Sequence, residues 1–307
     1  MWRVVFAALS GLLWGLFVTP LTMRLAARYR VVDHPGGRKR HQDVMPRGGG
    51  LALWSGCVLW SLFAQTGDGS LPFLLTGATV VFLVGYVDDM RPLSATLRLF
   101  FHLVAAGLAV LPLGMPLETR ILFLLWIAGC TSAFNNIDGL NGLCISLAGC
   151  CFAVPLVLGG RGMWAALCGL CAGVLAWNFP RARTFLGDGG SNLLGFLWGA
   201  LWVQFRGHTM ALQPLFPLMA ILFLLGGVPI LDTTYAILRR SLTGKSPFAP
   251  DRGHLHYRLI DGGVPLVGVV LLLCALHVFL LACGIYLLTG TLHLGLFASS
   301  VGVPWGA

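Results

Sequence analysis

The sequence has few charged residues for its length. Of its 307 residues only 10% are charged and 57% are hydrophobic, whereas a soluble domain has roughly 25% charged and 45–50% apolar residues. This shortage excludes an ordinary soluble protein. The apolar residues fall in long runs separated by short polar stretches, so we interpret residues 1–307 as a single membrane domain.

The sequence also lacks the patterns of a disulfide-rich or zinc-binding protein. Its nine cysteines are odd in number and all lie in apolar runs, which is typical of small buried side chains. Cys168 and Cys171 form a CxxC pair, but neither a second pair nor an HExxH motif accompanies it. No small-residue cleavage site follows the first apolar run, so this run is interpreted as a span and not as a signal peptide.

Ten apolar runs have about the length that a membrane-spanning helix needs. The sequence therefore predicts an all-α integral membrane fold with about ten transmembrane helices. The predicted spans cover roughly residues 4–27, 48–65, 71–87, 95–114, 120–136, 141–159, 163–179, 190–205, 213–238 and 264–289.

The connections between these runs differ sharply in charge. Alternate connections hold 16 of the 20 basic residues, and an excess of Lys and Arg marks the cytoplasmic side of a membrane protein. We therefore predict a multi-pass protein of the cell inner membrane with both termini outside. Nine of the 11 acidic residues share the basic side, which predicts an active site at the cytoplasmic face. Membrane topology then explains the net charge of +9 without a nucleic-acid partner.

Two acidic motifs lie at the ends of predicted spans on this side. Asp88 and Asp89 directly follow the run 71–87, and adjacent carboxylates at a membrane boundary need a cation, a shared proton or water. Asn135 and Asp138 would share one face of a continuing helix. Each motif also has an ordinary interpretation, as a solvated loop start and as a helix-ending turn.

A third acidic motif precedes the eighth span. Asp188 stands among Gly187, Gly189 and Gly190 and is followed by Ser191. Asp188 or Ser191 could cap the helix, and the glycines would expose backbone N–H groups at a positive helix end, which favours an anion. Capping alone explains one polar residue but not three glycines.

Basic segments with histidines complete the set. Residues 33–41 and 245–258 combine Arg and Lys with Asp, and the second segment also contains His254 and His256. These two histidines converge only if the segment is extended. Arg and His donors beside carboxylates suit a nucleotide diphosphate bridged by Mg²⁺.

Taken in order along the chain, these motifs resemble the polyprenyl-phosphate N-acetylhexosamine-1-phosphate transferases of glycosyltransferase family 4, and the WecA-like branch more than the MraY-like branch. The resemblance implies transfer of N-acetylhexosamine 1-phosphate, by default GlcNAc 1-phosphate, from a UDP-sugar to undecaprenyl phosphate with release of UMP. This would be the first membrane step of a cell-envelope polysaccharide such as lipopolysaccharide, O-antigen or teichoic acid. The matching segments are Asp33-His-Pro, Arg38-Lys39, His41, Pro46, Gly49-Gly50, Asp88-Asp89, Asn135, Asp138-Gly139, residues 185–191 and residues 246–256.

The resemblance also implies a role for individual residues. Asp88 would be the base that deprotonates the lipid phosphate, and Asp188 would bind Mg²⁺, or Mn²⁺ in its place, together with Asp89. The implied catalytic residues are Asp88, Asp89, Asp138 and His254. The implied substrate-binding residues are Arg38, Lys39, His41, Asn135, Asn141, Phe185, Arg252 and His256.

Some positions depart from the family pattern, and other functions stay open. Asn141 stands where the family often has Asp, Ser132 where it has Asn, and Tyr257 where it has the last His. The alternatives are a membrane transporter for a nucleotide sugar or an ion, and an inactive scaffold. Transporters often show repeated halves, and we find no such repeat in this sequence. The sequence leaves open whether the protein forms a homodimer.

Overall fold

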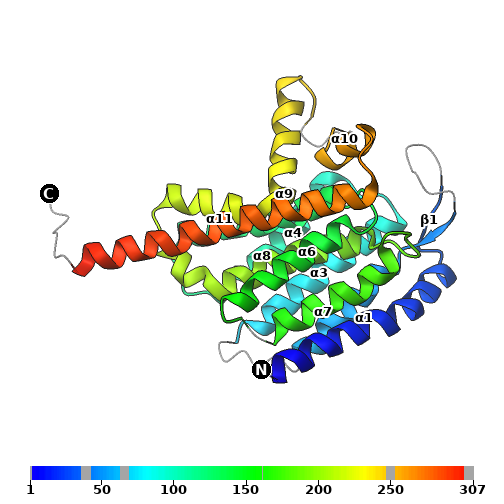
Figure 1. The fold of residues 1–307 in the computed structure, drawn as a ribbon, viewed down its shortest axis with the longest axis horizontal. Coiled ribbons are helices and arrows are strands. Elements are labelled where there is room, and N and C mark those ends of the chain that lie inside the picture. Colours follow the sequence, from blue (N-terminus) through cyan, green and yellow to red (C-terminus); the bar gives the residue numbers. More distant parts are fainter. Residues whose placement is uncertain (1, 36–42, 63–68, 161, 247–252, 301–307) are drawn as a thin grey trace.

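The computed structural model describes residues 2–35, 43–62, 69–160, 162–246 and 253–300, the last ten of these by their backbone only. This part of the chain is a helical bundle with one very short sheet at its end (Figure 1). Its elements are α1 (Trp2–Arg28), β1 (Val32–Asp33), β2 (Met45–Pro46), α2 (Gly49–Ser61), α3 (Leu71–Met90), α4 (Ala95–Val110), α5 (Leu117–Ile137), α6 (Leu143–Val157), α7 (Met163–Asn178), α8 (Gly187–Ala211), α9 (Leu215–Leu242), α10 (Leu255–Asp261) and α11 (Leu266–Ser300).

The structure confirms the all-α fold. Each predicted span coincides with one helix, and the additional helix is the short α10. Among the described residues, five helices are long and apolar enough to cross a membrane, namely α1, α3, α5, α9 and α11. Helices α4, α6 and α7 are apolar but shorter. The protein therefore has the helices of an integral membrane protein, and the count of ten spans stays a prediction.

Helix α8 lies at the centre of the bundle. Its residues 189–203 are buried without interruption, as expected of a helix that is apolar on all faces. The buried indoles of Trp198 and Trp202 are the largest side chains of this core. Because α3 and α5 both pack along α8, the ends of these helices meet around its first turn.

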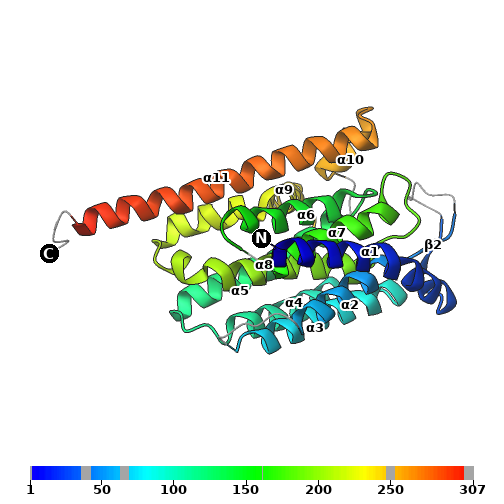
Figure 2. The same ribbon diagram turned by 60° about the horizontal axis from the view of Figure 1, so that its bottom comes forward.

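Helices α1 and α7 lie side by side (Figures 1 and 2). Gly11 and Gly15 of α1 face Gly169 and Gly173 of α7, and a Cβ atom at any of the four would collide with the backbone of the other helix. Small residues four apart allow this close approach in membrane helices. The pairing joins the first helix of the chain to its seventh.

Helix α9 is broken at Gly227, which has φ 58° and ψ −148°. Pro229 follows the break and has no N–H group to continue the helix. The second half of α9 turns away from the bundle and ends near α10, as the yellow helix in Figure 1 shows. Helix α10 and the β1–β2 pair lie at the same end of the molecule (Figure 2). In that antiparallel pair Asp33 lies opposite Met45.

Candidate active site

A cavity of about 500 Å³ opens at the end of the bundle where α5 ends and α8 begins. Its wall combines carboxylates, one guanidinium, amides and aromatic rings from separate segments of the chain between residues 33 and 266. The polar and aromatic residues that line it are Asp33, Arg47, Asp138, Asn141, Asn178, Phe185, Asp188 and Tyr257. The motifs predicted from the sequence thus meet at one place.

Asp89 holds the start of α8. Its Oδ1 accepts a hydrogen bond from the backbone N–H of Asp188 at 2.9 Å, and its Oδ2 accepts one from the N–H of Gly189 at 3.3 Å. Arg47 Nη1 donates to Oδ1 at 2.5 Å. The carboxylate satisfies N–H groups that have no partner within the helix and lies at the positive end of the helix dipole. The anion at this helix terminus is therefore the protein's own Asp89.

Two glycines make this arrangement possible. Gly187 has φ +69°, and a Cβ atom there would collide with the Asp89 carboxylate. Gly85 lets α3 approach the backbone of α8, because a Cβ atom there would lie 2.5 Å from the carbonyl oxygen of Asp188. Of the glycines that suggested an open anion site from the sequence, Gly187 and Gly189 serve the close contact with α3, and Gly190 packs against Gly50 of α2.

Arg47 lies between two carboxylates at the cavity wall. Its Nη2 donates to Asp33 Oδ1 at 2.5 Å, while Nη1 donates to Asp89. Burial alone would lower the pKa of Arg47, but the negative charges of Asp89 and Asp33 raise it above its ordinary value. Arg47 therefore stays charged and joins the β1–β2 segment to the end of α3.

Asp188 is an accessible acid of the site. Its side chain is 34% exposed, against 8% for Asp88. Arg98 Nη1 contacts both carboxylates, at 2.8 Å for Asp88 and 3.3 Å for Asp188. The two carboxyl groups lie close enough for the negative charge of Asp88 to disfavour ionisation of Asp188. Asp88 is fixed further by the N–H of Leu93, which donates to its Oδ1 at 2.5 Å.

Asp138 lies directly after the last residue of α5 and lines the cavity. Burial raises the pKa of Asp138 to about 7, and the negative charge of Asp89 adds to this shift while Arg47 opposes it. The protonation of Asp138 therefore depends on which charges enter the cavity near it.

Four predicted substrate-binding residues lie in the described part of the chain: Asn135, Asn141, Phe185 and His256, which is treated below. Asn135 Nδ2 donates to Ser191 Oγ at 3.0 Å, which joins α5 to the first turn of α8. Asn141 and Phe185 line the cavity, and Asn141 Nδ2 also donates to the carbonyl oxygen of Pro180 at 3.3 Å. Of the other substrate-binding predictions, Arg38, Lys39, His41 and Arg252 lie outside the described residues.

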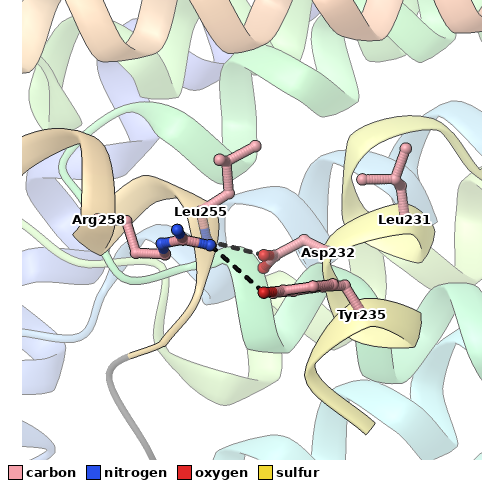
Figure 3. Close-up of a pocket in the computed structure, with 5 residues that line it drawn as sticks. All are labelled: Leu231, Asp232, Tyr235, Leu255 and Arg258. Atoms are coloured by element: carbon pink, nitrogen blue, oxygen red, sulfur yellow. Dashed lines mark hydrogen bonds between the residues drawn. The ribbon is translucent and has the colours of Figure 1, made fainter. Parts of the chain in front are cut away.

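His254 is buried and its ring is held on both sides. Asp232 Oδ2 accepts a hydrogen bond from His254 Nδ1 at 2.7 Å, and Arg240 Nη2 donates to Nε2 at 3.3 Å. Asp232 Oδ1 also accepts from the backbone N–H of Leu255 at 2.8 Å, as Figure 3 shows. His254 is not among the described residues that line the cavity. Asp232 thus joins the second half of α9 to the start of α10.

The Asp232 contacts predict a large effect of Asp232→Asn. The variant keeps the size of the side chain but offers one oxygen where two acceptors are used, so the hydrogen bond to His254 or that to Leu255 is lost. We expect turnover to fall about 10- to 100-fold, since a hydrogen bond to a buried charged group contributes roughly 1.5–3 kcal/mol. Steady-state product formation measures this effect. Asp261→Asn, at the exposed end of α10, is the control; an equal loss in both variants would contradict the role given to Asp232.

His256 packs against the end of α5. Its side chain is fully buried, and its ring centroid lies 4.1 Å from that of Tyr257. A Cβ atom at Gly139 would collide with both rings, so only glycine fits between α10 and the Asp138 motif. Neither ring nitrogen of His256 has a hydrogen-bond partner within the described residues. Burial lowers the pKa of His256 to about 4.

This buried histidine predicts that acid destabilises the protein. A folded-state pKa below the ordinary value means that stability is highest above about pH 6.5 and falls as the pH drops towards 4. His256 alone would contribute a loss of about 2 kcal/mol between pH 7 and pH 5. Thermal unfolding of the purified protein across this range measures the slope. His256→Gln should flatten the slope and His208→Gln, at an exposed position, should not; an unchanged slope in His256→Gln would refute the assignment.

Sequence reasoning gave no role to several residues of this site. Arg47, Arg98 and Arg240 were interpreted as topology charges, although each contacts a predicted catalytic residue. Asp33 belongs to a matching segment to which no role is assigned, and Asp232 is not among the predicted site residues. The only signal for Arg47 was its place in Pro46-Arg-Gly-Gly-Gly50, next to the glycines that pack on α8.

The comparison with known proteins shows the family of the chain. Residues 71–206 match glycosyl transferase family 4. A probable undecaprenyl-phosphate N-acetylglucosaminyl 1-phosphate transferase of Bacillus subtilis (strain 168) is 33% identical over 96% of this chain and 88% of its own length. The chain belongs to glycosyl transferase family 4. An undecaprenyl-phosphate alpha-N-acetylglucosaminyl 1-phosphate transferase of Yersinia pestis is 27% identical over 78% of this chain and 72% of its own.

A third relative of this chain comes from Mycolicibacterium smegmatis. It is a decaprenyl-phosphate N-acetylglucosaminephosphotransferase, 29% identical over 85% of this chain and 76% of its own length. The three relatives are named for the same sugar, two of them for undecaprenyl phosphate and the third for decaprenyl phosphate.

The oxygen atoms that line the cavity suit a magnesium ion. No cluster of three His, Cys, Asp or Glu side chains with metal-binding geometry is found among the described residues. Asp138 and Asp188 nevertheless line one cavity and offer oxygen atoms. Mg²⁺ prefers oxygen ligands and is usually bound by one or two carboxylates together with substrate phosphates.

Proposed function

We propose that the protein transfers N-acetylglucosamine 1-phosphate from UDP-N-acetylglucosamine to undecaprenyl phosphate, giving undecaprenyl-diphospho-N-acetylglucosamine and UMP. One observation carries the proposal: the accessible carboxylate of Asp188 stands at the start of α8 in a cavity shared with Arg47, Asp138 and Phe185. The relatives named as N-acetylglucosaminyl 1-phosphate transferases support the sugar and the polyprenyl acceptor. No relative reported above is named as a transporter or a scaffold, so neither alternative gains support.

Charge neutralisation and alignment are the main requirements of this reaction. Both substrates carry negative phosphates, and phosphoryl transfer depends largely on positioning and electrostatic stabilisation. Asp188 would hold Mg²⁺, with Mn²⁺ as a substitute, and the ion would neutralise the donor diphosphate. Asp89 uses both carboxylate oxygens on Arg47 and the start of α8, so we assign it to positioning Asp188 and not to the ion itself.

The acceptor phosphate would attack the β-phosphorus of the donor in line. A new P–O bond forms to the lipid phosphate, the P–O bond to UMP breaks, and UMP leaves with its electron pair. Asp88 is the proposed acceptor of the proton of the lipid phosphate, and Arg98 fixes its orientation. A route through a covalent aspartyl intermediate would instead allow UMP exchange without lipid acceptor. Measuring this exchange distinguishes the two routes.

We place this chemistry at the cytoplasmic face of the inner membrane. The β1–β2 pair, α10 and the cavity lie at one end of the bundle, while the start of α1 and the end of α11 lie towards the other end (Figure 1). Charge bias supports this orientation, with ten spans and both termini outside. To test this orientation, a single cysteine is introduced at each terminus of a cysteine-free variant. Labelling by an impermeant reagent in intact cells then measures whether each terminus is outside.

Product release from defined substrates tests the function. We expect the purified protein to release UMP from UDP-N-acetylglucosamine only when undecaprenyl phosphate and Mg²⁺ are both present, and EDTA to stop the reaction. A panel of UDP-sugars then tests the sugar, because Asn141 and Tyr257 line the cavity where the family pattern differs. Uptake of the nucleotide sugar by proteoliposomes without turnover would overturn the proposal in favour of a transporter.

A further inference from the structure

The break in α9 exposes backbone groups that neighbouring helices satisfy. Pro229 cannot donate to the carbonyl oxygen of Leu225, and the indole Nε1 of Trp198 in α8 donates to it instead, at 2.9 Å. One turn earlier, Trp126 Nε1 of α5 donates to the carbonyl oxygen of Leu222 at 2.8 Å. A buried polar group without a partner destabilises a fold, so these contacts stabilise the break itself.

His277 of α11 satisfies the freed N–H group at the break. The backbone N–H of Val228 donates to His277 Nδ1 at 3.2 Å. On the other side of the ring, Nε2 lies 3.1 Å from Cys151 Sγ. Because Nδ1 accepts, the ring is neutral with its proton on Nε2. The side chain is fully buried, and the cavity does not include it among the described residues of its lining.

Gly227 and His277 fit each other. The φ of +58° at Gly227 is a conformation that residues with a side chain rarely adopt, and a Cβ atom there would collide with the imidazole. The imidazole therefore fills the space beside the break and accepts its free N–H group. Both features fix the direction in which the second half of α9 leaves the bundle.

Asp232 lies in the second half of α9 and joins it to the start of α10. This residue lies five positions after Gly227 and binds both His254 and the backbone of Leu255. Helix α10 then brings Tyr257 to the cavity wall. A change in direction at the break would therefore move α10 relative to the acids of α3 and α8.

We propose that His277 is a positioning residue for the reaction. By accepting the Val228 N–H, His277 sets the direction of the second half of α9, and through Asp232 it sets the position of His254 and α10 at the cavity. The activity part of this inference rests on the proposed function, whereas its structural part does not.

Two isosteric variants test the hydrogen bond. His277→Asn retains an acceptor near the position of Nδ1, whereas His277→Gln places its amide near Nε2 and lacks that acceptor. By hydrogen–deuterium exchange of a peptide that spans residues 226–235, we expect His277→Gln to exchange about tenfold faster than the wild type and His277→Asn to stay within about threefold. Equal exchange in the two variants would overturn the proposal. Cys151→Ala, which removes the thiol beside Nε2 and leaves the Val228 contact in place, is the control and should exchange like the wild type.

A double-mutant cycle tests the route through Asp232. We expect His277→Gln to lower turnover about tenfold in the wild-type background and less than about threefold in the Asp232→Asn background, since residues that act through one network are not additive. If the fold losses of the two single variants multiply in the double variant, the route through Asp232 is overturned. If the wild type forms no product while the exchange results hold, the proposed function fails and the structural role of His277 stands.

Discussion

Asp188→Asn is expected to lower turnover by at least about a thousandfold, because removal of a charge that holds a catalytic metal ion has effects of this order. Asp188 is more exposed than Asp33, Asp88 and Asp89 and lines the cavity. Asn keeps the size of the side chain but loses the charge that the cation requires. UMP release at saturating donor and Mg²⁺ measures the loss. Full Mg²⁺-dependent turnover in this variant would overturn the metal assignment.

A matched control separates this effect from a general loss of acidic charge. Glu118 lies in the first turn of α5, at the other end of that helix from Asp138, and is exposed. Glu118→Gln should therefore leave turnover unchanged. The thermal stability of Asp188→Asn should not fall, since the carboxyl group of Asp188 lies close to that of Asp88 and the substitution removes their repulsion.

Gly187→Ala is expected to lower activity at least about a hundredfold and to destabilise the protein by roughly 2–4 kcal/mol, because it combines backbone strain with a steric clash. The position has φ +69°, and the new Cβ atom would displace the Asp89 carboxylate from the start of α8. Loss of that contact leaves the N–H groups of Asp188 and Gly189 without acceptors. Thermal unfolding and UMP release measure the two effects.

Gly149→Ala is the control for the glycine prediction. Gly149 lies within α6, and a Cβ atom there would make only an ordinary contact with Cys171 at 3.9 Å. Alanine also favours a helix more than glycine does. This variant should be as stable and as active as the wild type. Similar losses at both positions would show that the start of α8 has no special sensitivity.

The helices could be predicted from the sequence because burial in a membrane requires long apolar runs. Each predicted span coincides with one helix of the structure. The break in α9 was not predicted, although Gly227 and Pro229 lie inside the ninth run. Glycine and proline are tolerated in membrane helices when neighbours satisfy the backbone, and those neighbours, Trp198 and His277, lie on other helices.

The site could be predicted in part. Asp138, Asn141, Phe185 and Asp188 line the cavity as motifs that lie close to helix ends. The partner of each charge could not be predicted, because it depends on which helix ends meet in space. Arg47 and Asp89, for example, are 42 positions apart. The sequence motif also did not indicate that the His254 ring is buried and hydrogen-bonded through both of its nitrogens.

The backbone contact between α1 and α7 has a consequence for how the chain assembles during synthesis. Helix α1 is made before α7, and the glycines that contact it lie at Gly169 and Gly173 of α7. Five other helices are made before that partner exists. The mean hydropathy of 2.0 in α1 is enough to keep it in the bilayer alone. Helix α1 also packs against α2, which is made next, but its backbone contact with α7 forms only after more than half of the chain has been made.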